Sequence, residues 1–292
     1  MGDRTRIEWT RADDGTPGAT WNPVAGCYRI SPGCDHCYAE AIASRFAGTT
    51  AYPNGFAVTL HPDRLTQPLR WARPRRIFVN SMSDLFHPAV PDEYIASVFA
   101  VMAATPRHTY LVLTKRHGRM RSLLRDVCRC GAGHRPGEHF RAAMSWAATA
   151  HNPEGVPGLS GHEVYHRVPW PLPNVWLGIS AEDQRWWDVR VPALLEIPAA
   201  IRFVSAEPLL GPIRLTGISQ LSRPDWIIAG GESGPRARPM DPQWVRDLRD
   251  DAVRNQVPFF FKQWGGLHAK ANGRELDGRL WDQMPTPVGG PS

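Results

Sequence analysis

Three cysteines near the start of the sequence have the residue type and spacing of a metal site. Cys27, Cys34 and Cys37 form the pattern C-x6-C-x2-C, on a stretch that also holds Gly26 and the turn-forming tripeptide Ser31-Pro32-Gly33. Thiolates are soft ligands that suit an iron–sulfur cluster or zinc. A four-iron cubane held by three cysteines leaves one iron open to a small molecule, whereas a closed structural zinc site needs a fourth protein ligand. The spacing leaves both interpretations open.

A second group of potential ligands follows later in the chain. Cys128, Cys130, His134 and His139 lie in a long segment, 128–173, that is rich in Gly, Pro, His and Trp. Two thiols and two imidazoles suit a tetrahedral zinc site, and an irregular insertion of this length needs something to hold it together. The C-x-C spacing is tighter than the usual C-x2-C, so an exposed insertion without metal is the alternative.

These groups need a scaffold, and the sequence alternates short apolar runs with helical segments. The strand candidates are 21–24, 77–80, 109–114, 175–180, 201–205, 226–229 and 257–261, and the helix candidates are 38–46, 92–104, 118–127, 184–195 and 242–255. Such alternation indicates parallel pairing and an α/β fold. With about seven strands we expect a partial or complete (βα) barrel of the TIM type, a single domain over 1–292 with an irregular insertion at about 128–173. An open doubly wound sheet is the alternative.

Polar side chains follow the predicted strands. In a barrel the carboxyl ends of the strands converge on one face, where active sites form. We therefore interpret four of these residues as catalytic candidates, able to transfer protons or bind an anionic group, with structural ion pairs as the alternative. The glycine pair after the strand at 226–229 allows backbone amides to approach a ligand closely. The catalytic candidates are Asp84, Lys115, Glu207 and Lys262, and the ligand-binding candidates after strands are Asn80, Ser81, Gly230, Gly231 and Glu232.

Composition bounds the protein class and its partners. The 292 residues carry a formal net charge of +6, which points weakly to a polyanionic partner such as nucleic acid, with an arginine-rich solvated surface as the alternative. No apolar run reaches membrane-spanning length and the first residues lack the apolar core of a signal peptide, so we expect a cytoplasmic protein. Five cysteines, an odd number, favour metal binding over disulfides in such a reducing compartment.

A series of ordered sequence blocks resembles a known family. The blocks are 7–10, 20–40 with its three cysteines, 56–64, 76–87, 113–116, 174–178, 207–212, 230–235 and 259–265. They resemble the phage-associated three-cysteine-motif proteins, a family of unknown function, and the resemblance extends over almost the whole chain. That family is in turn similar to a divergent branch of radical S-adenosylmethionine (SAM) proteins, nearest to the spore photoproduct lyase-like group.

The resemblance implies a cofactor and roles for individual residues. It implies a barrel of the radical SAM kind, a [4Fe–4S] cluster on Cys27, Cys34 and Cys37, and SAM on the open iron, from which a 5′-deoxyadenosyl radical is generated. His36 takes the place, just before the last cysteine, that usually holds an aromatic residue packing on adenine. The first gap in the motif is six residues here, where radical SAM proteins usually have three. The resemblance also implies a three-Cys-motif partner protein encoded nearby.

The main hypothesis is therefore an iron–sulfur enzyme of the radical SAM type that acts on a nucleic acid or a nucleotide. Two alternatives come from other classes. One is a non-catalytic metal-binding protein that binds nucleic acid, and the other is a scaffold subunit of a two-component phage-associated system.

Overall fold

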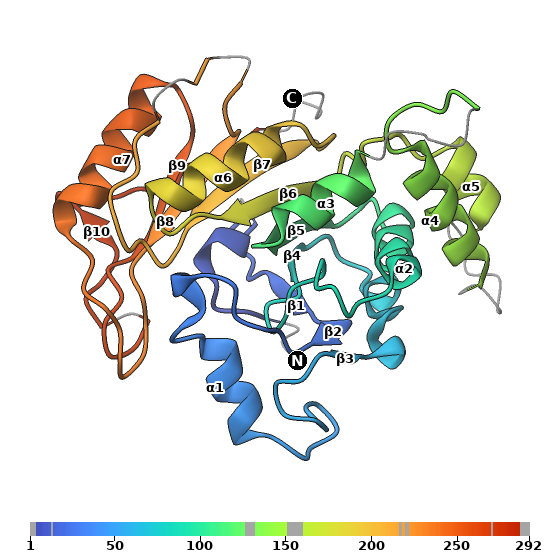
Figure 1. Ribbon diagram of the computed structural model, residues 1–292, viewed down its shortest axis with the longest axis horizontal. Coiled ribbons are helices and arrows are strands. Elements are labelled where there is room, and N and C mark those ends of the chain that lie inside the picture. The colour runs from blue at the N-terminus through green and yellow to red at the C-terminus, as the bar shows by residue number, and fades with distance from the viewer. Residues whose placement is uncertain are drawn as a thin grey trace.

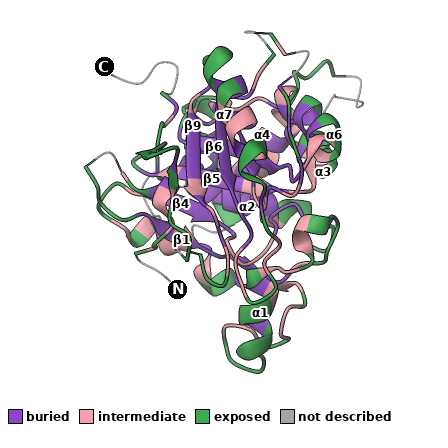
Figure 2. Cartoon of the chain, turned by 90° about the vertical axis from the view of Figure 1, so that its left-hand side faces the viewer, coloured by how far each residue is buried: buried purple, intermediate pink, exposed green. Residues whose placement is uncertain are grey.

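The computed structural model describes residues 4–12, 14–125, 132–150, 160–215, 218–219, 222–269 and 271–286. Seven parallel strands form the main sheet (Figure 1). They are β1 (Ala19–Trp21), β4 (Arg76–Val79), β5 (Thr109–Thr114), β6 (Val175–Ser180), β7 (Ile201–Ala206), β8 (Trp226–Gly230) and β9 (Phe259–Gln263). Most of their residues are buried, as expected for parallel strands covered on both faces (Figure 2).

The strand order distinguishes the two predicted architectures. The order is β1-β4-β5-β6-β7-β8-β9, so each strand pairs with the next main-sheet strand along the chain. A doubly wound sheet would reverse direction at a switch point, and this sheet does not. In the described residues β1 and β9 do not pair with each other, so the sheet stays open. The predicted α/β fold with about seven parallel strands is confirmed as a partial barrel, and the doubly wound alternative was wrong.

Helices follow most of the strands and cover one face of the sheet. α6 packs on β6 and β7, and α7 packs on β8 and β9 (Figure 1). α7 begins at Pro242 behind its N-cap Asp241, whose side chain accepts a hydrogen bond from the Gln243 backbone N–H. The helices are α1 (Tyr38–Arg45), α2 (Asp92–Ala103), α3 (His117–Leu124), α4 (Glu138–Ala150), α5 (Gly161–His166), α6 (Gln184–Leu195) and α7 (Pro242–Arg254).

The N-terminal segment fills the other face of the sheet. The short 3-10 helix η1 (Glu8–Thr10) places Trp9 in a second apolar cluster with alternate residues of the strands. The Trp9 ring lies 4.8 Å from Phe78 and 6.4 Å from both Phe203 and Trp226, measured between ring centroids. An open barrel needs such a plug, because its inner apolar side chains would otherwise face water.

Two expectations from the sequence need correction. The predicted strand at 21–24 is divided: β1 ends at Trp21, and β2 (Val24–Ala25) pairs antiparallel with β3 (Thr59–Leu60). Pro23 lies between them and has no backbone N–H for a continuous ladder. The described part of the segment 128–173 is not irregular either, since α4 and α5 lie in it.

The reason for the second difference is visible on α4. Phe140, Met144 and Ala148 recur at every fourth position and are buried, and α4 packs against α2, where the Phe99 and Phe140 rings are 5.1 Å apart. This apolar stripe gives the segment a helix that its Gly and Pro content obscured. In the described part of the chain, no helix combines the length and the apolar character needed to cross a membrane.

Candidate functional site

The cysteine loop, defined as residues 26–37, runs along the edge of the sheet at which the parallel strands end. Cys27 lies two residues after β2, Cys34 ends the 3-10 helix η2 (Pro32–Cys34), and Cys37 is the N-cap of α1. All three cysteines are free thiols and half-buried. The loop is bound to this edge by contacts at the ends of four strands, β4, β5, β6 and β8.

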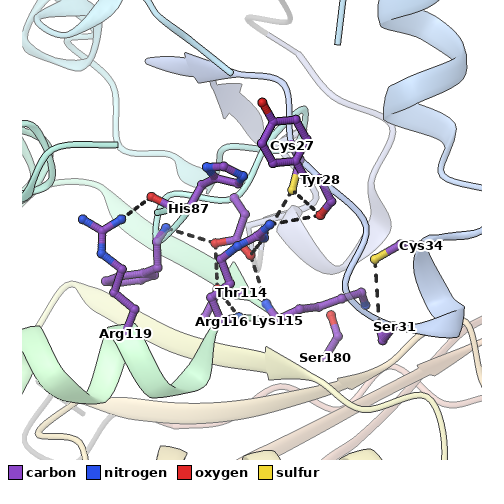
Figure 3. A network of polar contacts seen from close by, with 12 residues as sticks. Cys27, Tyr28, Ser31, Cys34, His87, Thr114, Lys115, Arg116, Arg119 and Ser180 are labelled. Carbon is purple, nitrogen blue, oxygen red and sulfur yellow. Dashed lines mark hydrogen bonds and ion pairs between the residues drawn. The ribbon is translucent and has the colours of Figure 1, made fainter. Parts of the chain in front are cut away.

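The first contacts lie at the ends of β4 and β5. The Gly26 backbone N–H donates to the Met82 carbonyl at 3.1 Å. Arg116, two residues after β5, donates from Nη1 to the Cys27 Sγ at 3.2 Å and from Nη2 to the Tyr28 carbonyl at 3.0 Å (Figure 3). A cation therefore lies against one of the candidate ligand sulfurs.

Asp84 holds Arg116 in place. Its carboxylate is 5% exposed and accepts from the Thr114 hydroxyl at 2.7 Å, the Phe86 N–H at 3.0 Å and the Lys115 N–H at 3.2 Å. Arg116 Nη1 also donates to it at 3.0 Å. Four donors take up the hydrogen-bonding capacity of a carboxylate, so Asp84 joins the ends of β4 and β5.

The third contact is made by Glu182, two residues after β6. Its buried carboxylate accepts from the Ser31 hydroxyl at 2.6 Å, from Lys115 Nζ at 2.9 Å and from Arg190 Nη1 at 3.0 Å. Burial would raise the pKa of this carboxyl, but the charges of Lys115 and Arg190 outweigh burial and lower the pKa. Gly33 lies so close that a Cβ there would be 2.5 Å from Glu182 Cγ and Oε1.

The fourth contact lies at the end of β8. Glu232 Oε2 is 3.0 Å from His36 Nδ1 and 2.9 Å from Arg238 Nε, and Arg238 Nη2 donates to the Pro32 carbonyl at 2.8 Å. Burial would raise the pKa of Glu232, but the hydrogen bonds from Arg238 lower it to about 2. Glu232 is therefore a carboxylate that binds the cysteine loop through His36 and, by way of Arg238, through Pro32.

Other predicted ligand-binding residues build the backbone of the edge. Asn80 has a φ of 56° and accepts from the Val24 N–H through Oδ1 at 3.4 Å, a left-handed conformation that Asn tolerates. The Ser81 hydroxyl donates to Asn22 Oδ1 at 3.2 Å. Gly231 leaves no space for a side chain, since a Cβ would be 2.0 Å from the Trp264 carbonyl oxygen. Gly230 ends β8 beside it.

Lys262 and Glu207 form the remaining charged pair at this edge. Lys262 Nζ lies 2.5 Å from Glu207 Oε1, and the two side chains are 20% and 19% exposed. Neither is hydrogen-bonded to the cysteine loop in the described residues. This pair is therefore more open to an incoming ligand than the buried contacts of Asp84 and Glu182.

The arginines of this network were not predicted from the sequence. Arg116 could have been noticed, because it directly follows Lys115 at a strand end. Arg190 lies inside α6 and Arg238 lies in the connection to α7, so neither has a position that indicates a role. Long side chains reach the site from distant positions, and strand-end patterns do not detect them.

The three thiols can be compared with the ligand sets that they were predicted to form. In the described part of the chain, no three Cys, His, Asp or Glu side chains lie close enough together to hold a single metal ion. A cubane differs from such a site because it distributes its thiolates over different irons. Burial raises the pKa of Cys27 to about 11 and raises that of Cys37, and the charge of Cys34 contributes to both shifts. Metal binding would have to displace these thiol protons.

The second candidate metal site is described in part. His139 Nε2 lies 2.8 Å from His134 Nδ1; His134 is exposed and His139 is partly buried. Cys128 and Cys130 lie outside the described residues.

Comparison with known proteins gives one match. No curated protein and no solved structure shows significant similarity to the chain. The model of the family DUF5131, described as a protein of unknown function, matches residues 4–285. Because this match covers nearly the whole sequence, the chain belongs to the DUF5131 family.

Proposed function

We propose that the chain is an iron–sulfur enzyme of the radical SAM type. One observation carries the proposal: three thiols on a single loop are fastened across the carboxyl edge of a partial parallel barrel by contacts at four strands. This edge is where α/β barrels carry their active sites. A loop that needed only to connect β2 with α1 would not require buried ion pairs to hold it.

In this proposal Cys27, Cys34 and Cys37 would hold a [4Fe–4S] cluster, with one iron left open to SAM. When bound, this pair supplies radical chemistry that removes hydrogen from a substrate. The donor set fits the cluster in two ways. The three thiols form no disulfide and are half-buried. Arg116 places a positive charge at the sulfur of Cys27, which offsets the negative charge that thiolates bring.

The protein groups around the loop have positioning roles. Glu182 binds the Ser31 hydroxyl, and Glu232 binds His36 directly and the Pro32 carbonyl by way of Arg238, so the loop that carries the thiols is held on two sides. Asp84 orients Arg116, and Lys115 neutralises Glu182. The Lys262–Glu207 pair is the candidate for contact with SAM or substrate, because its charges are partly exposed.

The proposed substrate is a nucleic acid or a nucleotide. The residues Tyr28, on the cysteine loop, and Tyr38, at the start of α1, are 60% and 52% exposed. Arg29, with a side chain that is 53% exposed, lies between them in sequence. Exposed aromatic rings beside arginine are suited to stacking on bases, and the net charge of +6 favours a polyanion. Three unpaired thiols fit the reducing cytoplasm.

The test is anaerobic purification followed by iron and sulfide analysis. We expect about four irons per chain, loss of iron in Cys27→Ala, Cys34→Ala and Cys37→Ala, and 5′-deoxyadenosine after addition of dithionite and SAM. A cluster without 5′-deoxyadenosine would remove the SAM part of the proposal. Zinc in place of iron would contradict the proposal and favour a non-catalytic metal-binding protein.

A further inference from the structure

The guanidinium of Arg116 donates a hydrogen bond to the sulfur of a candidate cluster ligand. Its Nη1 lies 3.2 Å from the Cys27 Sγ and 3.0 Å from Asp84 Oδ2, and its Nη2 donates to the Tyr28 carbonyl at 3.0 Å. The side chain is 9% exposed. Figure 3 shows it reaching from the end of β5 to the cysteine sulfur.

This contact is rigid. The planar fork of an arginine loses less freedom for each hydrogen bond than a lysine ammonium does, and here three acceptors fix it. Asp84 cannot move away easily, because Thr114 and two backbone N–H groups bind the same carboxylate. The positive charge is therefore held at the sulfur and cannot swing into solvent.

The neighbouring cations have other partners. Lys115 binds Glu182, and Arg119 donates to the His87 and Val90 carbonyls and to Asp92. Among the hydrogen bonds of the described residues, the one from a charged side chain to a cysteine sulfur is donated by Arg116 to Cys27. In the same set of hydrogen bonds, the Cys34 sulfur is paired with the Ser31 hydroxyl at 3.9 Å, and its interactions with Arg29 and Arg190 are electrostatic. The three candidate ligands thus differ in their electrostatic surroundings.

We propose that Arg116 raises the reduction potential of the cluster by donating a charged hydrogen bond to the Cys27 sulfur. This inference rests on the proposed function and concerns the regulation of that same site. A one-electron donor such as dithionite adds one electron to the oxidised cluster, which becomes more negative while dithionite is oxidised. A positive charge and an N–H···S bond stabilise the more negative state, so the potential rises.

The experiment is an anaerobic redox titration of the reconstituted full-length protein, followed by the EPR signal of the reduced cluster, with iron content measured on each sample. The variants are Arg116→Gln, which removes charge and fork, and Arg116→Lys, which keeps the charge and loses the fork. The matched control is Arg121→Gln on α3, where the arginine is 47% exposed and pairs with Glu196.

We expect midpoint potentials that fall in the order wild type, Arg116→Lys, Arg116→Gln, with the Arg121 variant equal to wild type. A variant at position 116 that holds a cluster with the wild-type midpoint overturns the inference, as does an equal shift in the Arg121 control. Should Arg116→Gln not assemble a cluster, the midpoint potential of Arg116→Lys relative to wild type tests the inference alone. Wild-type protein without a cluster would instead refute the proposed function.

Discussion

The close contact between the cysteine loop and Glu182 can be tested by adding one methyl group at Gly33. A Cβ at this position would lie 2.5 Å from Glu182 Cγ and Oε1 and 2.9 Å from Cδ. The carboxylate cannot turn aside freely, because Ser31, Lys115 and Arg190 hold it. In the Gly33→Ala variant either the cysteine loop moves away from Glu182, or Glu182 moves and its buried ion pairs with Lys115 and Arg190 break.

The magnitude follows from these two routes. Overpacking by one methyl group destabilises a protein by about 1–3 kcal/mol, whereas breaking a buried ion pair costs about 3–5 kcal/mol. The first route is cheaper, so we expect the loop to lift and the free energy of unfolding to fall by about 1–3 kcal/mol. Cys34 directly follows Gly33, so the variant should also bind less iron.

The assay is urea denaturation of the metal-free protein, which avoids stabilisation by bound metal, together with iron content after reconstitution. Gly118→Ala is the matched control, since a Cβ added to this residue of α3 would meet no atom within 4 Å. There alanine should stabilise by about 0.5–1 kcal/mol. If Gly33→Ala were as stable as wild type and bound full iron, the loop could not be seated on Glu182 as described.

Three further predictions concern the inner plug, a buried histidine and the exposed rings. Trp9→Ala should lower the free energy of unfolding by about 3–5 kcal/mol in urea denaturation, because Trp9 is buried against Phe78; a loss below about 1 kcal/mol would contradict its role as a plug. Burial lowers the pKa of His108 from 6.5 to about 4, so its contribution to stability is complete above pH 6.5 and is lost as the pH falls towards 4. Between pH 7 and pH 5 the free energy of unfolding should fall by about 2 kcal/mol because of this group. In His108→Gln, urea denaturation should show a fall that is smaller by this amount, and the same fall as in wild type would refute the assignment. Tyr28→Ala should weaken binding of a single-stranded oligonucleotide by about 1–3 kcal/mol, measured by fluorescence anisotropy, while Trp146→Ala on α4, also exposed to solvent but on another part of the molecule, should not (Figure 1); equal effects would argue against a specific stacking site.

The scaffold was predictable because its signals are local. The apolar runs at 109–114 and 175–180 coincide with β5 and β6, and the segment 184–195 coincides with α6. In parallel strands both faces are buried, so the strand itself is a continuous apolar run. Alternation with helices then indicates parallel pairing without knowledge of any long-range contact.

The contacts of the site were only partly predictable. Asp84 and Lys115 were predicted as polar residues after strands, because strand ends share an edge, whereas Glu182, which has the same position after β6, was not among the predicted site residues. Their partners were not predicted, since Ser31 and Glu182 are 151 residues apart in sequence. Residue spacing carries no information on such pairing. The antiparallel pair of β2 with β3 escaped prediction for a similar reason, as each strand has only two residues.

The contacts also separate the four residues that the sequence suggested as catalytic. Asp84 accepts four hydrogen bonds and Lys115 is paired with fully buried Glu182. To exchange a proton or bind substrate, either residue would first have to lose a buried partner, at about 3–5 kcal/mol, which is a rate penalty of at least about a hundredfold. An exposed pair exchanges partners for about 0–1 kcal/mol, and Lys262–Glu207, at 20% and 19% exposure, lies between the two cases. Asp84 and Lys115 therefore have positioning roles, and Glu207 and Lys262 are the residues that we expect to contact substrate or SAM.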